Sequence, residues 1–165
     1  MAQSMNSTSL GDTHLLEQLR LPKVAIVHTE WNDKIVRELV NGCEGIIHRF
    51  SGDIIDNIRV PGCFELPFAC RQLWERHKDK EIKPEAIIAF GVVIRGGTPH
   101  FDYVCRAVTD GILQLNLILP IPVIFGVLTL DNEAQAWERL GGEHGHKGEE
   151  AAITALKMIR IFRNG

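Results

Sequence analysis

Short apolar runs alternate along the chain with longer segments in which apolar residues recur at helical spacing. Residues 23–29 (KVAIVHT), 84–94 (PEAIIAFGVVI) and 121–129 (IPVIFGVLT) are nearly continuous apolar runs rich in β-branched side chains. Such runs are typical of strands covered on both faces of a parallel sheet. Residues 53–60 (DIIDNIRV) alternate loosely between apolar and polar positions and predict one more strand.

The segments that follow these runs have the period of amphipathic helices. Between residues 32 and 50 a single helical stripe contains Ile35, Val36, Leu39, Val40, Cys43, Ile46 and Ile47. Asn32 or Asp33 is suited to cap its start. Further helices are predicted over residues 64–77, 99–119, 131–142 and 147–163. The order β-α-β-α-β-α-β-α-α, without an internal repeat, predicts an α/β protein of three layers (α/β/α), with helices flanking a four-stranded parallel sheet.

Composition and charge narrow the class of protein. The 165 residues are 45% hydrophobic and 24% charged, which suits a single domain, predicted over residues 22–165. Residues 1–21 lack the basic start and continuous apolar stretch of a secretory signal, so we expect a polar N-terminal arm and a cytoplasmic protein. The net charge is −3 and the basic residues form no clusters, so the sequence lacks the basic patch that is typical of nucleic-acid-binding proteins.

Two further features exclude other classes. The longest apolar segment, residues 111–128, is interrupted by Gln114, Asn116, Pro120 and Pro122, so it is no uninterrupted membrane span of roughly 20 residues. The four cysteines form no Cys-x-x-Cys pair, which argues against a zinc knuckle or a disulfide framework. We therefore expect no membrane contact and no structural metal.

In open parallel sheets ligands bind beyond the carboxyl ends of the strands, so the loops there hold the candidate residues. Trp31 follows the first strand and can either cover the core or stack on a flat heterocycle. Glu65 stands at the turn from the second strand to the second helix. It can stabilise the helix start electrostatically or accept hydrogen bonds from substrate hydroxyls. The residues alone leave both pairs of alternatives open.

The segment IRGGTPH, residues 94–100, combines two glycines with a helix start at Pro99. Glycines allow a ligand to approach the backbone closely, and the helix N-terminus favours an anion such as phosphate. The spacing is neither a Walker loop nor the Gly-x-Gly-x-x-Gly fingerprint of dinucleotide-binding proteins. His100 lies in the first helical turn, where the neutral imidazole is favoured, and is either a proton acceptor or a surface capping residue.

A last group of candidates lies in the glycine-rich segment ERLGGEHGHKGEE, residues 138–150. His144 and His146 form a His-x-His pair, but no glutamate or cysteine completes a recognisable ligand spacing, so a metal site is disfavoured. Arg139 and Lys147 flank the glycines and can contact phosphate and carbonyl groups, the arginine as a planar fork and the lysine as a point charge. The alternative for both is a solvated surface loop.

Four of these motifs occur in the order and spacing of the lumazine synthase family. They are VPGCFELP (60–67), GVVIRGGTPHFDYV (91–104), IPVIFGVLT (121–129) and ERLGGEHGHKGEEAA (138–152). The chain resembles that family from about residue 23 to residue 160, nearly everything except the arm. The resemblance implies a flavodoxin-like fold and an enzyme of the riboflavin pathway. That enzyme condenses 5-amino-6-(D-ribitylamino)uracil with 3,4-dihydroxy-2-butanone 4-phosphate, and it needs no metal or organic cofactor.

The resemblance also implies roles for single residues. It matches His100 to a histidine that transfers a proton, and Trp31 to an aromatic residue that stacks on the uracil ring, with Asn32 beside it. The other matches concern substrate binding: Phe64 and Glu65 hold the ribityl chain, Val93 and Ile94 contact the pyrimidine, Gly97 and Thr98 face the phosphate, Arg139 grips it, and Phe125 and Lys147 complete the site. In the family, the residues that match Phe125 and Arg139 usually come from the neighbouring subunit.

Members of the family assemble as homopentamers, and in some members twelve pentamers form an icosahedral shell, a 60-mer. The segment LGGEHGHKG lacks the insertion that many pentameric members carry, which favours a shell. An association with riboflavin synthase, the role of the arm, and the role of His146, where many relatives have Asn, stay open.

Two other hypotheses fit part of the pattern. A flavin-binding or electron-transfer protein of the same fold would not need both Arg139 and His100. A non-catalytic paralogue that binds the ligand would retain Trp31 and Glu65.

Overall fold

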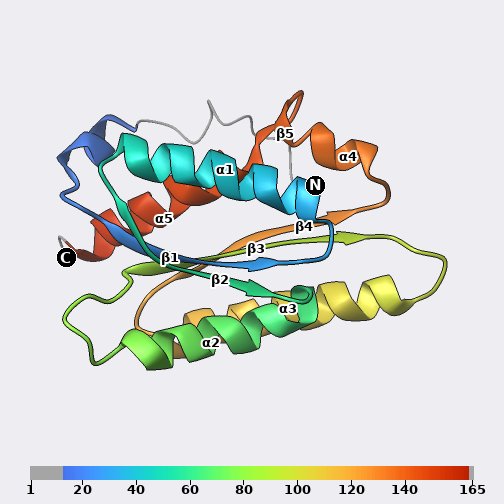
Figure 1. Cartoon of the computed structure of the whole chain (residues 1–165), viewed down its shortest axis with the longest axis horizontal. Coiled ribbons are helices and arrows are strands. Elements are labelled where there is room, and N and C mark those ends of the chain that lie inside the picture. The colour runs from blue at the N-terminus through green and yellow to red at the C-terminus, as the bar shows by residue number, and fades with distance from the viewer. Residues whose placement is uncertain (1–12, 164–165) are drawn as a thin grey trace.

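The computed structural model describes residues 13–163, so most of the predicted N-terminal arm, residues 1–12, lies outside the described residues. Four parallel strands form one sheet in the order β2-β1-β3-β4: β1 (Lys23–Thr29), β2 (Asp53–Val60), β3 (Ala86–Ile94) and β4 (Val123–Leu130). Helices α1 (Asp33–Arg49) and α5 (Lys147–Arg163) cover one face, and α2 (Leu66–His77) and α3 (His100–Ile118) cover the other (Figure 1). The predicted three-layer, flavodoxin-like α/β/α fold is confirmed.

The central strand β3 explains the continuous apolar runs of the sequence. Residues 86–92 are all buried, because alternate side chains of a strand point to opposite faces and both faces are covered by helices. Ile88 and Phe90 belong to the cluster under α1 and α5, whereas Ile87 and Ala89 belong to the cluster under α2 and α3. The sheet therefore has two hydrophobic cores, one on each face.

The segment between β4 and α5 differs from the prediction. The helix expected over residues 131–142 is limited to α4 (Ala134–Trp137), and a small hairpin of β5 (Leu140–Gly142) and β6 (Gly145–His146) follows it. Gly141 and Gly145 have φ values of 99° and 72°, a region that glycine adopts without the cost that other residues incur. The glycines thus allow the chain to reverse in the hairpin, whereas α4 has already ended at Trp137, before the first of them.

Part of the expected polar arm contributes to the core. The 3-10 helix η2 (His14–Gln18) precedes β1, and Leu16 and Leu19 are only 1% and 7% exposed in the cluster under α1 and α5. Cys43, Cys63, Cys70 and Cys105 are all free. No helix within residues 13–163 is long and apolar enough to cross a membrane.

Helices α1 and α5 meet at Gly148. A Cβ placed on Gly148 would overlap the carbonyl oxygen and carbon of Leu39, which belong to the backbone of α1. Gly45, also in α1, is the opposite case, because a Cβ placed there would meet nothing within 4 Å. The two glycines therefore form a matched pair for testing this helix contact.

We expect Gly148→Ala to destabilise the protein by about 1–3 kcal/mol, because the added methyl group forces α5 away from α1. Gly45→Ala should instead stabilise it by about 0.5–1 kcal/mol, since a helix interior prefers alanine and the methyl group has open space. Denaturant titration of the free energy of unfolding measures both changes. Wild-type stability in Gly148→Ala would contradict the close contact.

Candidate active site

A pocket of about 650 Å³ lies at the carboxyl ends of β1 and β3, beside the 3-10 helix η3 (Cys63–Glu65) and the start of α3. It brings together most of the predicted site residues: Trp31, Asn32, Phe64, Glu65, Val93, Ile94, Thr98 and His100. Gly97 is not part of the lining, although its neighbours Gly96 and Thr98 are. The loops that follow β1, β2 and β3 thus line one cavity.

The loop that carries Trp31 is tied to the end of β2. The backbone N–H of Glu30 donates to the Val60 carbonyl at 2.8 Å, and that of Trp31 donates to the Pro61 carbonyl at 3.2 Å. The buried Thr29 hydroxyl also donates to the Trp31 carbonyl at 3.3 Å. With its backbone held in this way, Trp31 has a side chain that is 73% exposed, so it does not cover the core and its face is available to a ligand.

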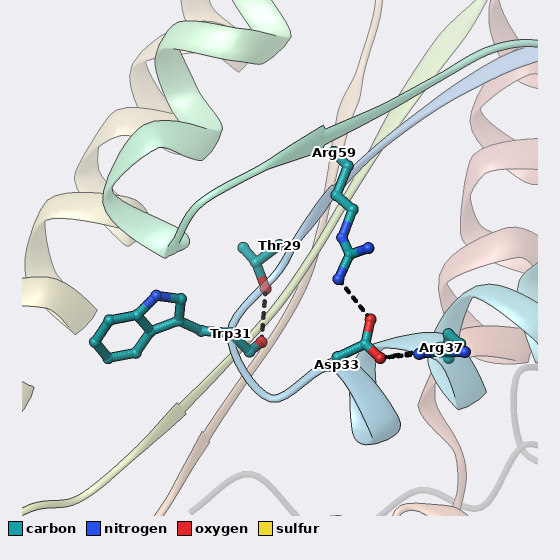
Figure 2. A network of polar contacts seen from close by, with 5 residues as sticks. All are labelled: Thr29, Trp31, Asp33, Arg37 and Arg59. Atoms are coloured by element: carbon teal, nitrogen blue, oxygen red, sulfur yellow. Dashed lines mark hydrogen bonds and ion pairs between the residues drawn. The ribbon is translucent and has the colours of Figure 1, made fainter.

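An ion-pair network anchors the next residues to the sheet (Figure 2). One carboxylate oxygen of Asp33 accepts a hydrogen bond from Arg59 of β2 at 2.7 Å, and the other accepts one from Nε of Arg37 at 3.0 Å. The hydrogen bond from Arg37 is the main reason why the pKa of Asp33 lies below its usual range. Figure 2 shows the indole of Trp31 pointing away from Asp33 and the two arginines. Trp31 lines the pocket, whereas Arg37 and Arg59 do not.

Asn32 occupies the N-cap position of α1, but the capping role expected for its side chain is wrong. The residue is left-handed, with φ 61° and ψ 37°, and its side chain makes no capping hydrogen bond. Its Nδ2 instead donates to the carbonyl oxygen of Val92 at 3.0 Å. Asn32 therefore joins the loop after β1 to the end of β3, whose residues 92–94 line the same pocket. Just before α4, Oδ1 of Asn132 accepts a hydrogen bond from the N–H of Gln135 at 3.1 Å.

The turn after β2 presents two exposed side chains, Phe64 and Glu65, above a buried thiol. The side chain of Glu65 makes no hydrogen bond that caps α2. Burial raises the pKa of Cys63 to about 12, so this thiol is a packing group and not a nucleophile. A Cβ placed on Gly91 would lie 2.5 Å from its sulfur, which explains why β3 has a glycine at this point.

Arg95, to which the sequence assigned no role, braces the glycine loop. Its Nε donates to Asp131 at 2.9 Å, its Nη1 donates to Asp102 at 3.3 Å, and its guanidinium lies 4.1 Å from the ring centroid of Phe101. The hydrogen bond to Asp131 is the main reason why its pKa is raised. Arg95 thereby connects the loops after β3 and β4 with the first turn of α3. The only signal in the sequence was a single charge at a strand end.

The loop held by Arg95 is open where the phosphate was expected. A Cβ placed on Gly96 or on Gly97 would meet nothing within 4 Å, so nothing in the described chain requires glycine at these two positions. His100 is the first residue of α3 and is exposed on the pocket wall. Because Asp102 is engaged by Arg95, the carboxylate nearest to His100 in the sequence already has a cationic partner.

The remaining predicted residues lie elsewhere in the chain. Phe125 and Lys147 line a separate groove of about 470 Å³ along β4, which is an edge strand of the sheet. Nζ of Lys147 donates to the Glu150 carboxylate at 2.9 and 2.7 Å. Arg139 lines neither cavity, and its Nη1 donates to the Gln135 carbonyl at 2.8 Å. Within one chain these three residues do not reach the pocket of Trp31 and His100.

The two histidines of the hairpin have different partners. Nε2 of His144 lies 3.8 Å from the Glu138 carboxylate, whereas Nδ1 of His146 accepts a hydrogen bond from the N–H of Glu149 at 3.4 Å. Between residues 13 and 163, no group of three or more His, Cys, Asp or Glu side chains is placed to hold a metal ion.

A parallel α/β/α sheet whose carboxyl edge gathers an aromatic face, a carboxylate, a glycine loop and a histidine has the organisation of an α/β enzyme that acts on small molecules. Residues 22–163 match the family model described as 6,7-dimethyl-8-ribityllumazine synthase. The chain belongs to this family, whose members are transferases of riboflavin biosynthesis.

Individual relatives agree with the family match. The 6,7-dimethyl-8-ribityllumazine synthase of Porphyromonas gingivalis is 48% identical over 143 residues, 86% of each chain. The one from Streptomyces coelicolor is 44% identical over 144 residues, again 86% of each chain. The one from Parabacteroides distasonis is 43% identical over 164 residues, 98% of this chain and 99% of the relative. This last similarity therefore extends through the segment before residue 22.

Two substitutions of Asn32 separate the contribution of its side-chain hydrogen bond from that of its left-handed backbone conformation. Asn32→Gly should cost about 0.5–1.5 kcal/mol of stability, because it loses the hydrogen bond to Val92 while retaining the backbone conformation. Asn32→Ala should cost about 1–2 kcal/mol more than glycine, because it also disfavours the positive φ. Denaturant titrations of the three proteins give both differences. Equal stability of the glycine and alanine variants would rule out the left-handed conformation.

Proposed function

We propose that the pocket at the carboxyl edge is the site at which this chain makes 6,7-dimethyl-8-ribityllumazine. The substrates are 5-amino-6-(D-ribitylamino)uracil and 3,4-dihydroxy-2-butanone 4-phosphate. The observation that carries the proposal is the convergence of Trp31, Glu65, Thr98 and His100 on one cavity. These residues come from the loops after β1, β2 and β3, and no short sequence motif places them together.

The uracil occupies the part of the pocket nearest to β1 and β3. Its flat ring stacks on the exposed indole of Trp31, an arrangement that aromatic faces favour. The backbone of Val93 and Ile94 contacts the edge of the ring, and Asn32, bonded to Val92, fixes the distance between indole and strand. The ribityl chain extends toward Phe64 and Glu65, where the carboxylate accepts hydrogen bonds from its hydroxyls.

The phosphorylated ketone lies against the glycine loop and the start of α3. The open space over Gly96 and Gly97 accommodates the phosphate group, Thr98 donates to it, and the N-terminus of α3 favours its negative charge. Arg139 and Lys147 add two cations, and Phe125 adds an apolar wall. We propose that a neighbouring copy of the chain supplies these three residues, since in one chain they lie away from the pocket.

The reaction needs one proton acceptor, His100, and much of the rate enhancement comes from holding the two substrates in position. The 5-amino group of the uracil condenses with the ketone to an imine, and a water molecule leaves. His100 takes a proton from the adjacent carbon, and the electron pair left behind expels inorganic phosphate. After tautomerisation, the ribitylamino nitrogen attacks the remaining carbonyl and a second water leaves, which closes the pyrazine ring. Holding both substrates in one pocket replaces a bimolecular encounter.

The exposed surface of α3 supports assembly into a homo-oligomer. Only Val108, Ile112 and Leu115 of this helix are buried, whereas apolar side chains along the rest of it are exposed: Tyr103, Leu113, Leu117 and Ile118. Several exposed large apolar side chains on one helix are typical of a surface that another protein chain covers. We propose a homopentamer, with an icosahedral 60-mer as the larger assembly because the hairpin between α4 and α5 is short, and with riboflavin synthase as a candidate partner.

We also place the protein in the cytoplasm. The four cysteines are all free, and Cys63 and Cys105 both lie close to the pocket. Free thiols of this kind persist in a reducing compartment.

The test of the function is direct mixing of the purified chain with both substrates. Appearance of the lumazine chromophore, at a rate that depends on both substrate concentrations, supports the synthase. Binding of the uracil without turnover would support a non-catalytic paralogue instead. Binding of a flavin with no turnover of the two substrates would favour the flavin-binding alternative.

His100→Ala should lower the single-turnover rate by about 10²–10⁴-fold, the range for loss of a positioned general base. Folding and assembly should be unchanged, because the side chain is exposed. His48→Ala, at an exposed histidine in the last turn of α1, is the matched control and should keep the wild-type rate. An unchanged single-turnover rate in His100→Ala would remove the proton-transfer role.

Arg139→Ala should raise the Michaelis constant for the phosphorylated ketone by about tenfold or more, because a charge-assisted contact to phosphate is lost. The Michaelis constant for the uracil should change much less. Arg76→Ala, at an exposed arginine in the last turn of α2, is the control. Steady-state kinetics with each substrate varied in turn measures both constants, and equal increases for the two substrates would count against this assignment.

A further inference from the structure

The hairpin between α4 and α5 connects the two cations assigned to the phosphate. Strands β5 and β6 pair with Leu140 opposite His146, and the N–H of Lys147 donates to the Arg139 carbonyl at 2.9 Å. Arg139 and Lys147 therefore stand at the two ends of one hairpin and are joined by a main-chain hydrogen bond. A contact that holds the backbone of Lys147 in place therefore also restrains the backbone of Arg139.

The imidazole of His146 lies between this hairpin and α1. A Cβ placed on Gly42 of α1 would overlap the ring and would lie 2.6 Å from its Nδ1, so the ring packs directly on bare helix backbone. On the hairpin side, Cδ2 of the ring is 4.0 Å from the Cβ position of Gly141, an ordinary contact. Nδ1 accepts the N–H of Glu149 at 3.4 Å, one of the amides without a helical partner at the start of α5.

Lys147 is fixed from both sides along the chain. On one side His146 packs on Gly42, and on the other the backbone of Gly148 lies against the Leu39 carbonyl. Both contacts are made with α1, a turn apart, so the Lys147 backbone between them has little freedom to move. Its Nζ, directed into the groove along β4, is held by Glu150.

We propose that His146 is a positioning residue for phosphate recognition. It touches no substrate; it packs on Gly42 and caps α5, and in this way sets where Lys147 and, through the hairpin, Arg139 present their charges. This inference rests on the proposed function, because it takes the phosphorylated ketone as the group that the two cations meet. It gives His146 a purpose that neither a metal site nor a solvated loop would provide.

Three substitutions separate the two contacts of the ring. His146→Ala removes both the acceptor and the ring. His146→Asn keeps an acceptor at the same number of bonds from Cα, so it can cap α5 without filling the space over Gly42. His146→Phe keeps a ring on Gly42 but has no acceptor. Glu143→Ala, at an exposed position in the same hairpin, is the matched control.

A fourth substitution, on α1, disturbs the same contact between His146 and Gly42. Gly42→Ala leaves the hairpin sequence intact, is favourable for the interior of α1, and displaces the ring of His146. It keeps the test decisive should His146→Ala fold poorly, because it changes the position of the hairpin without touching any of its residues.

In the assembled enzyme, His146→Ala and Gly42→Ala should each raise the Michaelis constant for the phosphorylated ketone by about tenfold, the scale on which small misplacements of binding groups act. The Michaelis constant for the uracil should stay within about twofold. His146→Asn, which restores only the cap, and His146→Phe, which restores only the ring on Gly42, should each recover part of the ketone affinity. A purely structural role would lower the amount of active enzyme and leave both constants unchanged. Unchanged or equally raised constants, or no recovery in His146→Asn, would overturn the proposal.

Calorimetric binding of inorganic phosphate separates this inference from the proposed function. If the wild-type chain binds phosphate but forms no lumazine, the proposed function fails, whereas a loss of phosphate affinity in His146→Ala still supports the positioning role. Equal phosphate affinity of wild type and His146→Ala, or no phosphate binding by the wild type, would overturn the positioning role even if the enzyme is active.

Discussion

The burial of residues 86–92 of β3 is the constraint on which the rest of the structure depends. A parallel strand that is apolar on both faces requires a helical layer on each side, and crossovers of one hand then carry every strand in the same direction. All four carboxyl ends consequently meet at one edge, and helices α1, α3 and α5 begin there. The pocket, the glycine loop and the start of α3 are close together because residues 86–92 have no access to water.

The sequence was informative where one physical effect dominates. The strands over residues 23–29 and 53–60 agree with the structure at both ends, because apolar periodicity and burial determine them. That the candidate residues in the loops directly after β1, β2 and β3 line one pocket was also predictable, since strand polarity alone brings these loops together.

The features that the sequence did not predict depend on which of several possible contacts forms, and a pattern of apolar and polar residues does not decide between them. A glycine-rich segment fits a helix stop and a hairpin equally well, and the observed hairpin makes contacts with residues far along the chain, such as that of His146 with Gly42. Asn32 fits an N-cap, but its side chain donates to the Val92 carbonyl and makes no capping hydrogen bond. Leu16 and Leu19 are isolated apolar residues in a polar segment, and a pattern without periodicity gave no reason to bury them. The single charge of Arg95 at a strand end did not reveal its role, because its partners come from two other segments.

The separation of the Trp31 pocket from the groove of Phe125 and Lys147 has a genetic consequence. If each working site takes one part from each of two copies, a copy defective at His100 still offers an intact β4 groove, and a copy defective at Arg139 still offers an intact pocket. Two variants that are each inactive can then give an active enzyme when they are co-expressed, because some sites in the mixed assembly combine the intact part of one variant with the intact part of the other. For a site shared in this way, selection would act on the contact between copies, of which a single chain carries only half.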